Sequence, residues 1–159
     1  MLEEQAAQPK AAYVRNALHG LQDLRLEELL GMTHGLADSV HEAIDLIYPL
    51  LTRRLVANWQ ALHRHGTHDA DVVRLLPCCV ARFEALPGWE RAGIEAALHE
   101  AAREAEVDAA AARGTVTVCL LFDHSRLPLF DATAYLGRAE SVRRLRAMRD
   151  HLNAALLIG

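Results

Sequence analysis

Apolar residues recur at helical spacing along most of the chain. Between residues 36 and 62, leucine, isoleucine and valine follow one another at intervals of three, four and seven, the period of one face of an α-helix. Pro49 lies inside this stretch and lacks a backbone donor, so we expect a kink or a break there and two helices, over about 36–47 and 49–64. The same spacing predicts further helices: two short ones within 11–30, and others over 69–86, 88–106, 129–136 and 139–156.

The clearest linker is the sequence HRHGTHD at residues 63–69, where glycine and polar residues interrupt the apolar periodicity. This linker predicts two parts of the chain, an N-terminal helical part over 1–66 and a C-terminal part over 67–159.

One segment departs from the helical pattern. In GTVTVCLLF, residues 114–122, β-branched residues dominate, and taken alone this run is typical of a strand. A single strand has no partner to pair with, so the pattern by itself leaves the conformation of this segment open.

Composition favours an all-α protein. Alanine (28 residues) and leucine (26 residues) make up about a third of the 159 residues, whereas aromatic residues make up only 5%. The chain is long enough to bury a substantial core, and its three cysteines show no C-x-x-C spacing. We therefore expect no cofactor and no structural metal.

The distribution of charge narrows the choice of partners. The formal net charge of −4 argues against wholesale electrostatic capture of nucleic acid or of an anionic membrane. Residues 138–150, however, hold five arginines against Glu140 and Asp150, and they form the only basic patch. Residues 84–108 hold seven acidic and two basic groups, so that surface should avoid phosphate.

Neither a membrane nor a secretory pathway is indicated. No apolar run approaches the roughly 20 residues that a transmembrane helix needs. The first ten residues, MLEEQAAQPK, lack the basic and apolar blocks of a signal peptide, so we expect a cytoplasmic protein.

Motifs for catalysis are missing from the sequence. It contains no phosphate-binding glycine loop, no zinc-protease helix and no nucleophile elbow, so we expect no catalysis by this chain alone. His63, His65 and His68 with Asp69 could in principle bind a metal. Their loose spacing on a glycine-containing linker favours solvated loop histidines instead.

Two segments of the C-terminal part resemble a known family. They are ALPGWERAGIEAALHEAARE from Ala85 and LPLFDATAYLGRAESVRRL from Leu127. The order of residues is similar to that in the C-terminal anticodon-binding domain of bacterial glutamyl-tRNA synthetases, with its L-P-x-W-x-x-x-x-I-E-x-x-L helix and its P-G-L-F-x-x-L-x-x-L-G-K/R-E-x-x-x-x-R-L signature. The resemblance implies an all-helical bundle or cage of the class I synthetase anticodon-binding type over 67–159.

The resemblance also settles our expectation for the strand-like segment. In the family the stretch before P-G-L-F is helical and, with the turn that follows, approaches the anticodon bases, which implies a helix over 116–122 here. The family's arginine in that stretch falls at Thr117, and this loss of a cation weakens the case for specific anticodon readout. The implied contacts to RNA, with arginines on phosphates and the turn facing unstacked bases, are Thr117, Arg126, Leu129, Arg138, Arg143 and Arg144.

Two functions follow as hypotheses. The first is a non-catalytic tRNA-binding module, related to or a fragment of glutamyl-tRNA synthetase, because the H-I-G-H-like and K-M-S-K-S-like motifs of the class I catalytic half are missing from the sequence. The second is a helical protein-interaction domain that kept the cage fold and lost RNA binding. The implied partners are tRNA, with glutamate tRNA as the specific candidate, and a separate catalytic subunit or other protein.

Overall fold

The computed structural model describes residues 25–53, 59–64, 68–122 and 126–158, and all regular secondary structure within these ranges is helical. The helices in chain order are α2 (Leu26–Thr33), α3 (Val40–Leu51), α4 (Trp59–Arg64), α5 (Asp69–Ala85), α6 (Arg91–Glu104), α7 (Ala109–Leu121), α8 (Leu129–Leu136) and α9 (Arg138–Ile158). The prediction of an all-α protein is confirmed. No helix in the described part of the chain is long and apolar enough to cross a bilayer.

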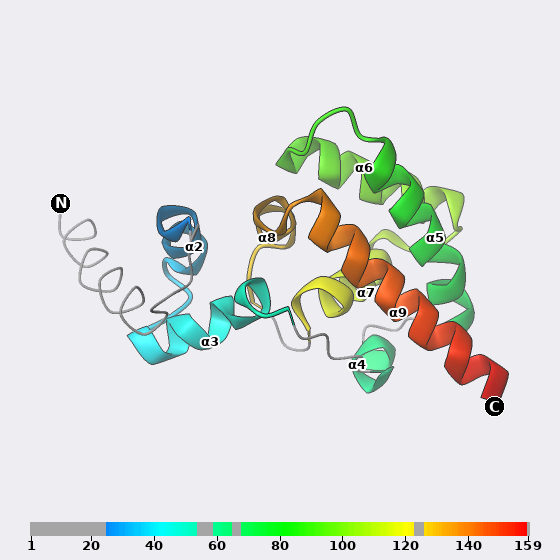
Figure 1. Ribbon diagram of the computed structural model, residues 1–159, viewed down its shortest axis with the longest axis horizontal. Coiled ribbons are helices and arrows are strands. Elements are labelled where there is room, and N and C mark those ends of the chain that lie inside the picture. Colours follow the sequence, from blue (N-terminus) through cyan, green and yellow to red (C-terminus); the bar gives the residue numbers. More distant parts are fainter. Residues whose placement is uncertain (1–24, 54–58, 65–67, 123–125, 159) are drawn as a thin grey trace.

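Helix α5 packs along both α6 and α9 and forms the main packed unit with them (Figure 1). Ile94 and Leu98 of α6 and Leu145 of α9 are buried in it, as their helical spacing predicts. The rings of Phe83 and Trp89 meet edge to face, with their centroids 5.3 Å apart. This unit is the support on which the shorter helices lie.

Helix α7 contains the segment whose pattern was typical of a strand. Asp108 begins the helix, because its side chain accepts hydrogen bonds from the backbone N–H groups of Ala110 at 3.0 Å and Ala111 at 3.2 Å. The helix is then buried on nearly all sides, against α6, α8, α9, α3 and α4. A helix surrounded in this way is apolar all round, so its sequence loses the polar face that marks a surface helix. The expectation of a helix is confirmed up to Leu121; Phe122 follows as its C-cap with φ 66°.

The prolines do not break the helices, contrary to our expectation at Pro49. Helix α3 begins at Val40, after Ser39 accepts a hydrogen bond from the Glu42 N–H, and it continues through Pro49 to Leu51. Pro49 lies in the last turn of the helix, and its buried ring packs as an apolar side chain. The predicted helices 36–47 and 49–64 are therefore wrong: one helix ends at Leu51, and α4 begins at Trp59.

Helices α2 and α3 stand to one side of the packed unit, on the left in Figure 1. Helix α3 contacts α7 and α8, α2 contacts α8, and α4 contacts α7. The predicted pair of helices within 11–30 falls mostly outside the described residues. The division of the chain into 1–66 and 67–159 stays a prediction.

Candidate nucleic-acid interface

Arg143 is exposed on α9 and is held by two partners. Its Nε and Nη2 donate to the Glu140 carboxylate at 2.8 and 2.7 Å, one turn earlier on the same helix. Nη2 also donates to the carbonyl oxygen of Arg53 at 3.1 Å, although the two residues are 90 positions apart in the sequence. This second contact brings the end of the α3 region to the surface of α9.

Arg144, the next residue, lies in the interior. Only 2% of the residue is exposed, and it is among the largest fully buried side chains of the described chain. Its guanidinium donates to Glu140 and to the carbonyl oxygens of Pro49, Leu120 and Thr52. The structure therefore corrects the assignment of Arg144 as a phosphate contact, because a guanidinium enclosed in this way presents no surface to RNA.

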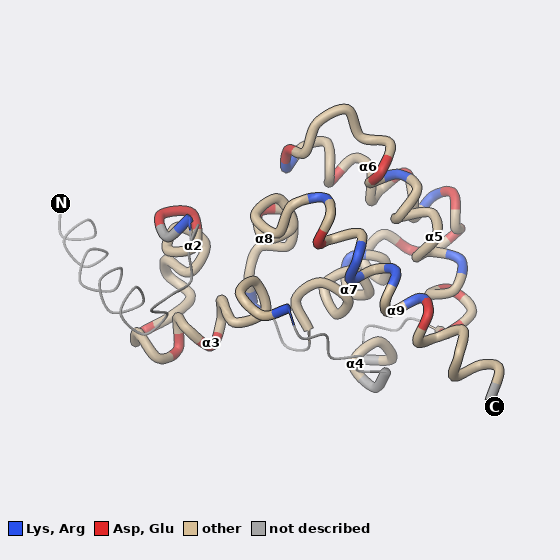
Figure 2. The backbone as a smooth tube through the Cα atoms, viewed as in Figure 1, with Lys and Arg blue, Asp and Glu red and all other residues tan. Residues whose placement is uncertain are grey.

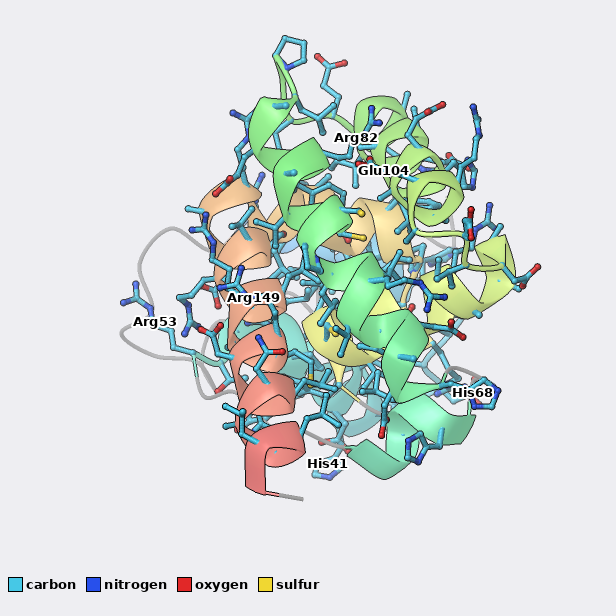
Figure 3. All side chains as sticks on the ribbon, turned by 90° about the vertical axis from the view of Figure 1, so that its right-hand side faces the viewer. His41, Arg53, His68, Arg82, Glu104 and Arg149 are labelled. Carbon is cyan, nitrogen blue, oxygen red and sulfur yellow. The ribbon has the colours of Figure 1, made fainter. Side chains whose placement is uncertain are left out.

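Arg53 was not among the predicted contacts, yet it joins the arginines of α9. Figure 3 shows its side chain pointing outward on the same side of the molecule as Arg149, away from His68. Arg53 is exposed and makes no ion pair within the described part of the chain. Its neighbourhood with Arg143 arises from tertiary packing, and the sequence holds no signal for it beyond two consecutive arginines at 53 and 54.

Two more arginines follow Arg143 along α9, at steps of three residues. Arg146 forms an ion pair with Glu84 of α5, and Arg149 with its neighbour Asp150 at 2.9 Å. Residues three apart are neighbours on a helix surface. We define the basic face as Arg53, Arg143, Arg146 and Arg149.

Arg138, a predicted contact, is half-buried at the start of α9. Its Nη2 donates to the carbonyl oxygen of Leu86 at 2.6 Å, and its guanidinium carbon lies 5.7 Å from the centroid of the Trp89 ring. These contacts join α9 to the loop before α6. The structure thus gives Arg138 a packing role and does not bring it into the basic face.

Arg126 and Leu129 lie at a second place, beside a cleft of about 760 Å³ between α2 and α8. Arg126 is exposed, and its Nη2 lies 3.0 Å from Glu42 Oε1 in the first turn of α3. Leu129 is the half-buried first residue of α8, directly after Pro128, which lines the cleft. The cleft is lined by Arg25, Glu28, Gly31, Met32, His34, Leu36, Trp89, Arg126, Pro128, Asp131, Ala134 and Tyr135.

Thr117 is half-buried on α7, and its hydroxyl is already used. Its Oγ1 donates to the carbonyl oxygen of Arg113 at 2.8 Å, one turn back in the same helix. Arg113 itself lies over the Phe130 ring, 5.7 Å from its centroid. Thr117 therefore offers no positive charge and no unused donor, whereas an arginine at this position would add both.

Two of the predicted contacts, Arg126 and Arg143, lie at opposite ends of α3. Arg126 pairs with Glu42 near its start, and Arg143 reaches Arg53 just past its end. The twelve residues of α3 span about 18 Å at 1.5 Å per residue. Helix α3 therefore spaces the cleft from the basic face.

The carboxylates that face these arginines are perturbed in the expected direction. The hydrogen bond from Arg143, and then that from Arg144, holds the pKa of Glu140 below its ordinary value. The backbone N–H of Asp38, and then Arg126, does the same for the pKa of Glu42. Both carboxylates are therefore ionised at neutral pH and neutralise part of the arginine charge.

The histidine cluster does not assemble in the described residues. His63 Nε2 lies 2.9 Å from Asp69 Oδ1, while His65 falls outside the described part of the chain. No group of three histidine, cysteine, aspartate or glutamate side chains converges within the described ranges. The His63–Asp69 pair joins the ends of α4 and α5.

Comparison with known proteins places this geometry in a family. The family model described as the anticodon binding domain matches residues 5–149. Glutamate–tRNA ligase from Mycobacterium sp. (strain KMS) is 38% identical over 87 residues, which cover 54% of this chain and 18% of that protein. Glutamate–tRNA ligase from Salinispora arenicola is 30% identical over 94 residues, which cover 59% of this chain and 19% of that protein.

A solved structure shows the same fold. The glutamate tRNA ligase from Elizabethkingia meningosepticum superposes with a TM-score of 0.77 over 94% of this chain and 30% of its own, at 13% sequence identity. The chain spans about a fifth of the length of the curated relatives that it matches. It belongs to the anticodon-binding domain family and is related to the domain of that type in glutamyl-tRNA synthetases.

Proposed function

We propose that this chain is a non-catalytic tRNA-binding module, and that tRNA phosphates lie on the basic face. The observation that carries the proposal is the basic face itself: in a chain of net charge −4, arginines from two distant segments gather on one side of the molecule. Membership of the anticodon-binding family supports RNA as the partner. Glutamate tRNA is the specific candidate.

The arginines of this face are suited to exchanging partners. Their ion pairs with Glu140, Glu84 and Asp150 are at least partly exposed to solvent, and ion pairs in contact with solvent contribute only about 0–1 kcal/mol. A guanidinium can therefore leave its carboxylate for a phosphate, to which it donates two parallel hydrogen bonds. Arg53 has no such ion pair to give up among the described residues.

The test is the salt dependence of tRNA binding. Each arginine–phosphate contact releases counterions, so losing one contact lowers the slope of log K against log salt by about 0.7–0.9. We expect Arg53→Ala and Arg143→Ala each to lower the slope by about that amount. The matched control is Arg103→Ala on α6: Arg103 is also exposed and also paired with a glutamate three residues earlier, but it lies outside the basic face.

The opposite results would overturn the proposal. If Arg103→Ala lowers the slope as much as Arg143→Ala does, the basic face is not the binding surface. If the parent chain shows no salt-dependent binding of tRNA at roughly 50 mM salt, where phosphate contacts are strongest, RNA binding itself is excluded.

The cleft beside Arg126 and Leu129 is the proposed position of the anticodon bases. Thr117→Arg restores a cation where the related family has one. We expect this change to tighten binding of the glutamate anticodon stem-loop more than binding of an unrelated stem-loop. Equal tightening of both would show that the added charge acts on phosphates alone.

The same proposal predicts that the chain alone does not catalyse aminoacylation. Because the sequence holds no class I catalytic motif, purified chain with ATP and glutamate should form neither aminoacyl-adenylate nor charged tRNA. Pyrophosphate exchange by the purified chain would contradict this.

A further inference from the structure

The buried guanidinium of Arg144 donates hydrogen bonds to carbonyl oxygens at the C-terminal ends of two helices, α3 and α7. Arg144 Nη1 donates to the carbonyl oxygens of Pro49 and Leu120, both at 2.6 Å, and Nη2 donates to that of Thr52 at 2.8 Å. Pro49 and Thr52 belong to the C-terminal end of α3, and Leu120 to the last turn of α7. The last carbonyls of a helix have no partner within the helix and carry partial negative charge, so a cation there satisfies both needs.

The buried guanidinium also has an opposite charge and an aromatic ring as partners within the chain. Its Nε donates to Glu140 Oε1 at 2.9 Å, and its guanidinium carbon lies 5.6 Å from the centroid of the Phe122 ring. Glu140 also holds Arg143, so one carboxylate orients both arginines. The buried charge is thus paired and hydrogen-bonded, the condition under which burial of a charge is tolerated.

Arg143 and Arg144 both donate hydrogen bonds to the backbone of segment 49–53. Arg144 takes the carbonyls of Pro49 and Thr52 in the interior, while Arg143 takes the carbonyl of Arg53 at the surface. Because successive residues on a helix point about 100° apart, one can face the core while the next faces solvent. Segment 49–53 is therefore held against α9, with the backbone of Arg53 in contact with Arg143 and the side chain of Arg53 exposed.

We propose that Arg144 is a positioning residue that assembles the basic face, since it holds the end of α3 against α9 and so places Arg53 next to Arg143. This role rests on the proposed function, in which the basic face receives RNA phosphates. Arg144 does not touch the RNA. It acts through Arg53, which contributes its charge to the face only while segment 49–53 is docked.

The first test needs no RNA. In Arg144→Met the side chain keeps its bulk and loses its donors, so amide hydrogen exchange of Thr52, whose N–H donates to the Tyr48 carbonyl, should rise about ten-fold or more. The exchange rate of amides in the buried part of α5 should increase less. Arg144→Lys, which keeps the charge and fewer donors, should give an intermediate increase at Thr52. The control Arg103→Met, at an exposed arginine of α6 away from this segment, should change the exchange of neither set of amides.

The second test asks whether the RNA contact of Arg53 depends on Arg144. In the parent, Arg53→Ala should lower the salt slope of tRNA binding by about 0.7–0.9, and in the Arg144→Met background it should lower it no further. Arg143→Ala should keep its effect in both backgrounds. A merely structural role for Arg144 would weaken binding without abolishing the effect of Arg53→Ala alone.

The outcomes separate the two claims. An equal effect of Arg53→Ala in both backgrounds, or unchanged exchange at Thr52 in Arg144→Met, overturns the positioning role and leaves tRNA binding intact. Absence of salt-dependent tRNA binding by the parent overturns the proposed function, and this role with it.

Discussion

Helices α6 and α9 carry the same local ion pair and present opposite surfaces. On α6, Arg103 Nη2 lies 3.0 Å from the carboxylate of Glu100, three residues earlier; on α9, Arg143 Nη2 lies 2.7 Å from that of Glu140 with the same spacing. Judged by the pair alone, the two arginines are equivalent. The comparison teaches that a local ion pair does not identify a nucleic-acid surface.

What surrounds each pair makes the difference. Residues 84–108 hold seven acidic and two basic groups, whereas residues 138–150 hold five arginines and two acidic groups. Figure 2 shows arginine positions recurring along α9. Arg143 also reaches the carbonyl of Arg53 from a distant segment, and no such tertiary partner is recorded for Arg103 among the described residues. The charges around an arginine and its tertiary contacts decide whether it belongs to a surface suited to nucleic acid.

The largest expected effect separates the two neighbours on α9. Arg144→Met removes a buried cation and leaves Glu140 and three carbonyls short of a donor, so the free energy of unfolding should fall by about 3–5 kcal/mol. Arg143→Met breaks an exposed pair and should cost less than about 1 kcal/mol. Urea denaturation followed by circular dichroism measures both. Equal losses would mean that burial of Arg144 contributes nothing.

The next effect tests whether a cation outside α9 belongs to the interface. Arg126→Ala should weaken binding of the glutamate anticodon stem-loop by about 1–3 kcal/mol if this side chain contacts a base, by analogy with bidentate contacts to bases in DNA. The matched control is Arg82→Ala, which also removes an exposed arginine paired across helices, here from α5 to Glu104 of α6 at 3.1 Å. Fluorescence anisotropy at fixed salt gives both affinities. Equal losses would show that only net charge matters.

A smaller effect is expected from pH. The pKa of Glu140 is lowered in the folded chain by Arg143 and Arg144, so this carboxylate stabilises the fold above its unfolded pKa, and the stabilisation is lost as pH falls through the folded pKa. Glu140→Gln should therefore lower stability at neutral pH and flatten its decline in acid. Glu100→Gln on α6 is the control, and denaturation at a series of pH values is the measurement. If stability falls with acid as steeply in Glu140→Gln as in the parent, the pairing of Glu140 with Arg143 and Arg144 does not stabilise the fold.

The smallest effect sharpens the contrast between the two surfaces. Glu84→Gln removes the carboxylate that faces Arg146 and should tighten tRNA binding about two- to five-fold at low salt, since an exposed pair holds the arginine by only about 0.2–1 kcal/mol. Glu100→Gln, which releases Arg103 on the acidic surface, should change the affinity less. Tightening of the same size in both would indicate a response to net charge alone.

Features that depend on neighbours along the chain were predictable. Helix α8 was expected over 129–136, and its observed bounds, Leu129–Leu136, match because Gly137, with φ 85°, ends it in a conformation that glycine adopts readily. The apolar period of α9 predicted the burial of Val142, Leu145, Met148 and Leu152 for the same reason, since the period of a helix is a local property. Leu156, which continues that period, is exposed, because no element of the described chain covers the end of the helix. In such cases residues close together in the sequence are enough to indicate where a helix ends or which face of it is buried.

Features that depend on the surroundings could not be predicted from the hydrophobic pattern alone. The pattern of α7 was typical of a strand, and only the helices packed around it give a β-branched, nonpolar run a reason to be helical. Pro49 indicated a break, yet it lies where the helix is about to end and the apolar packing accepts its ring. In both cases tertiary packing outweighs a local preference of about 1–3 kcal/mol.

By itself, the sequence determined the helical class, the amphipathic faces and, through the resemblance of two segments, the family. Tertiary structure alone decided which arginines are available to RNA. Arg143 and Arg144 are adjacent and chemically identical, but rotation by about 100° along the helix sends one to solvent and the other to the carbonyl ends of α3 and α7. Arg53 joins the face from 90 residues away. The reason is physical: periodicity is a property of neighbouring residues, whereas the burial of a charge depends on the partners that the folded chain brings to it.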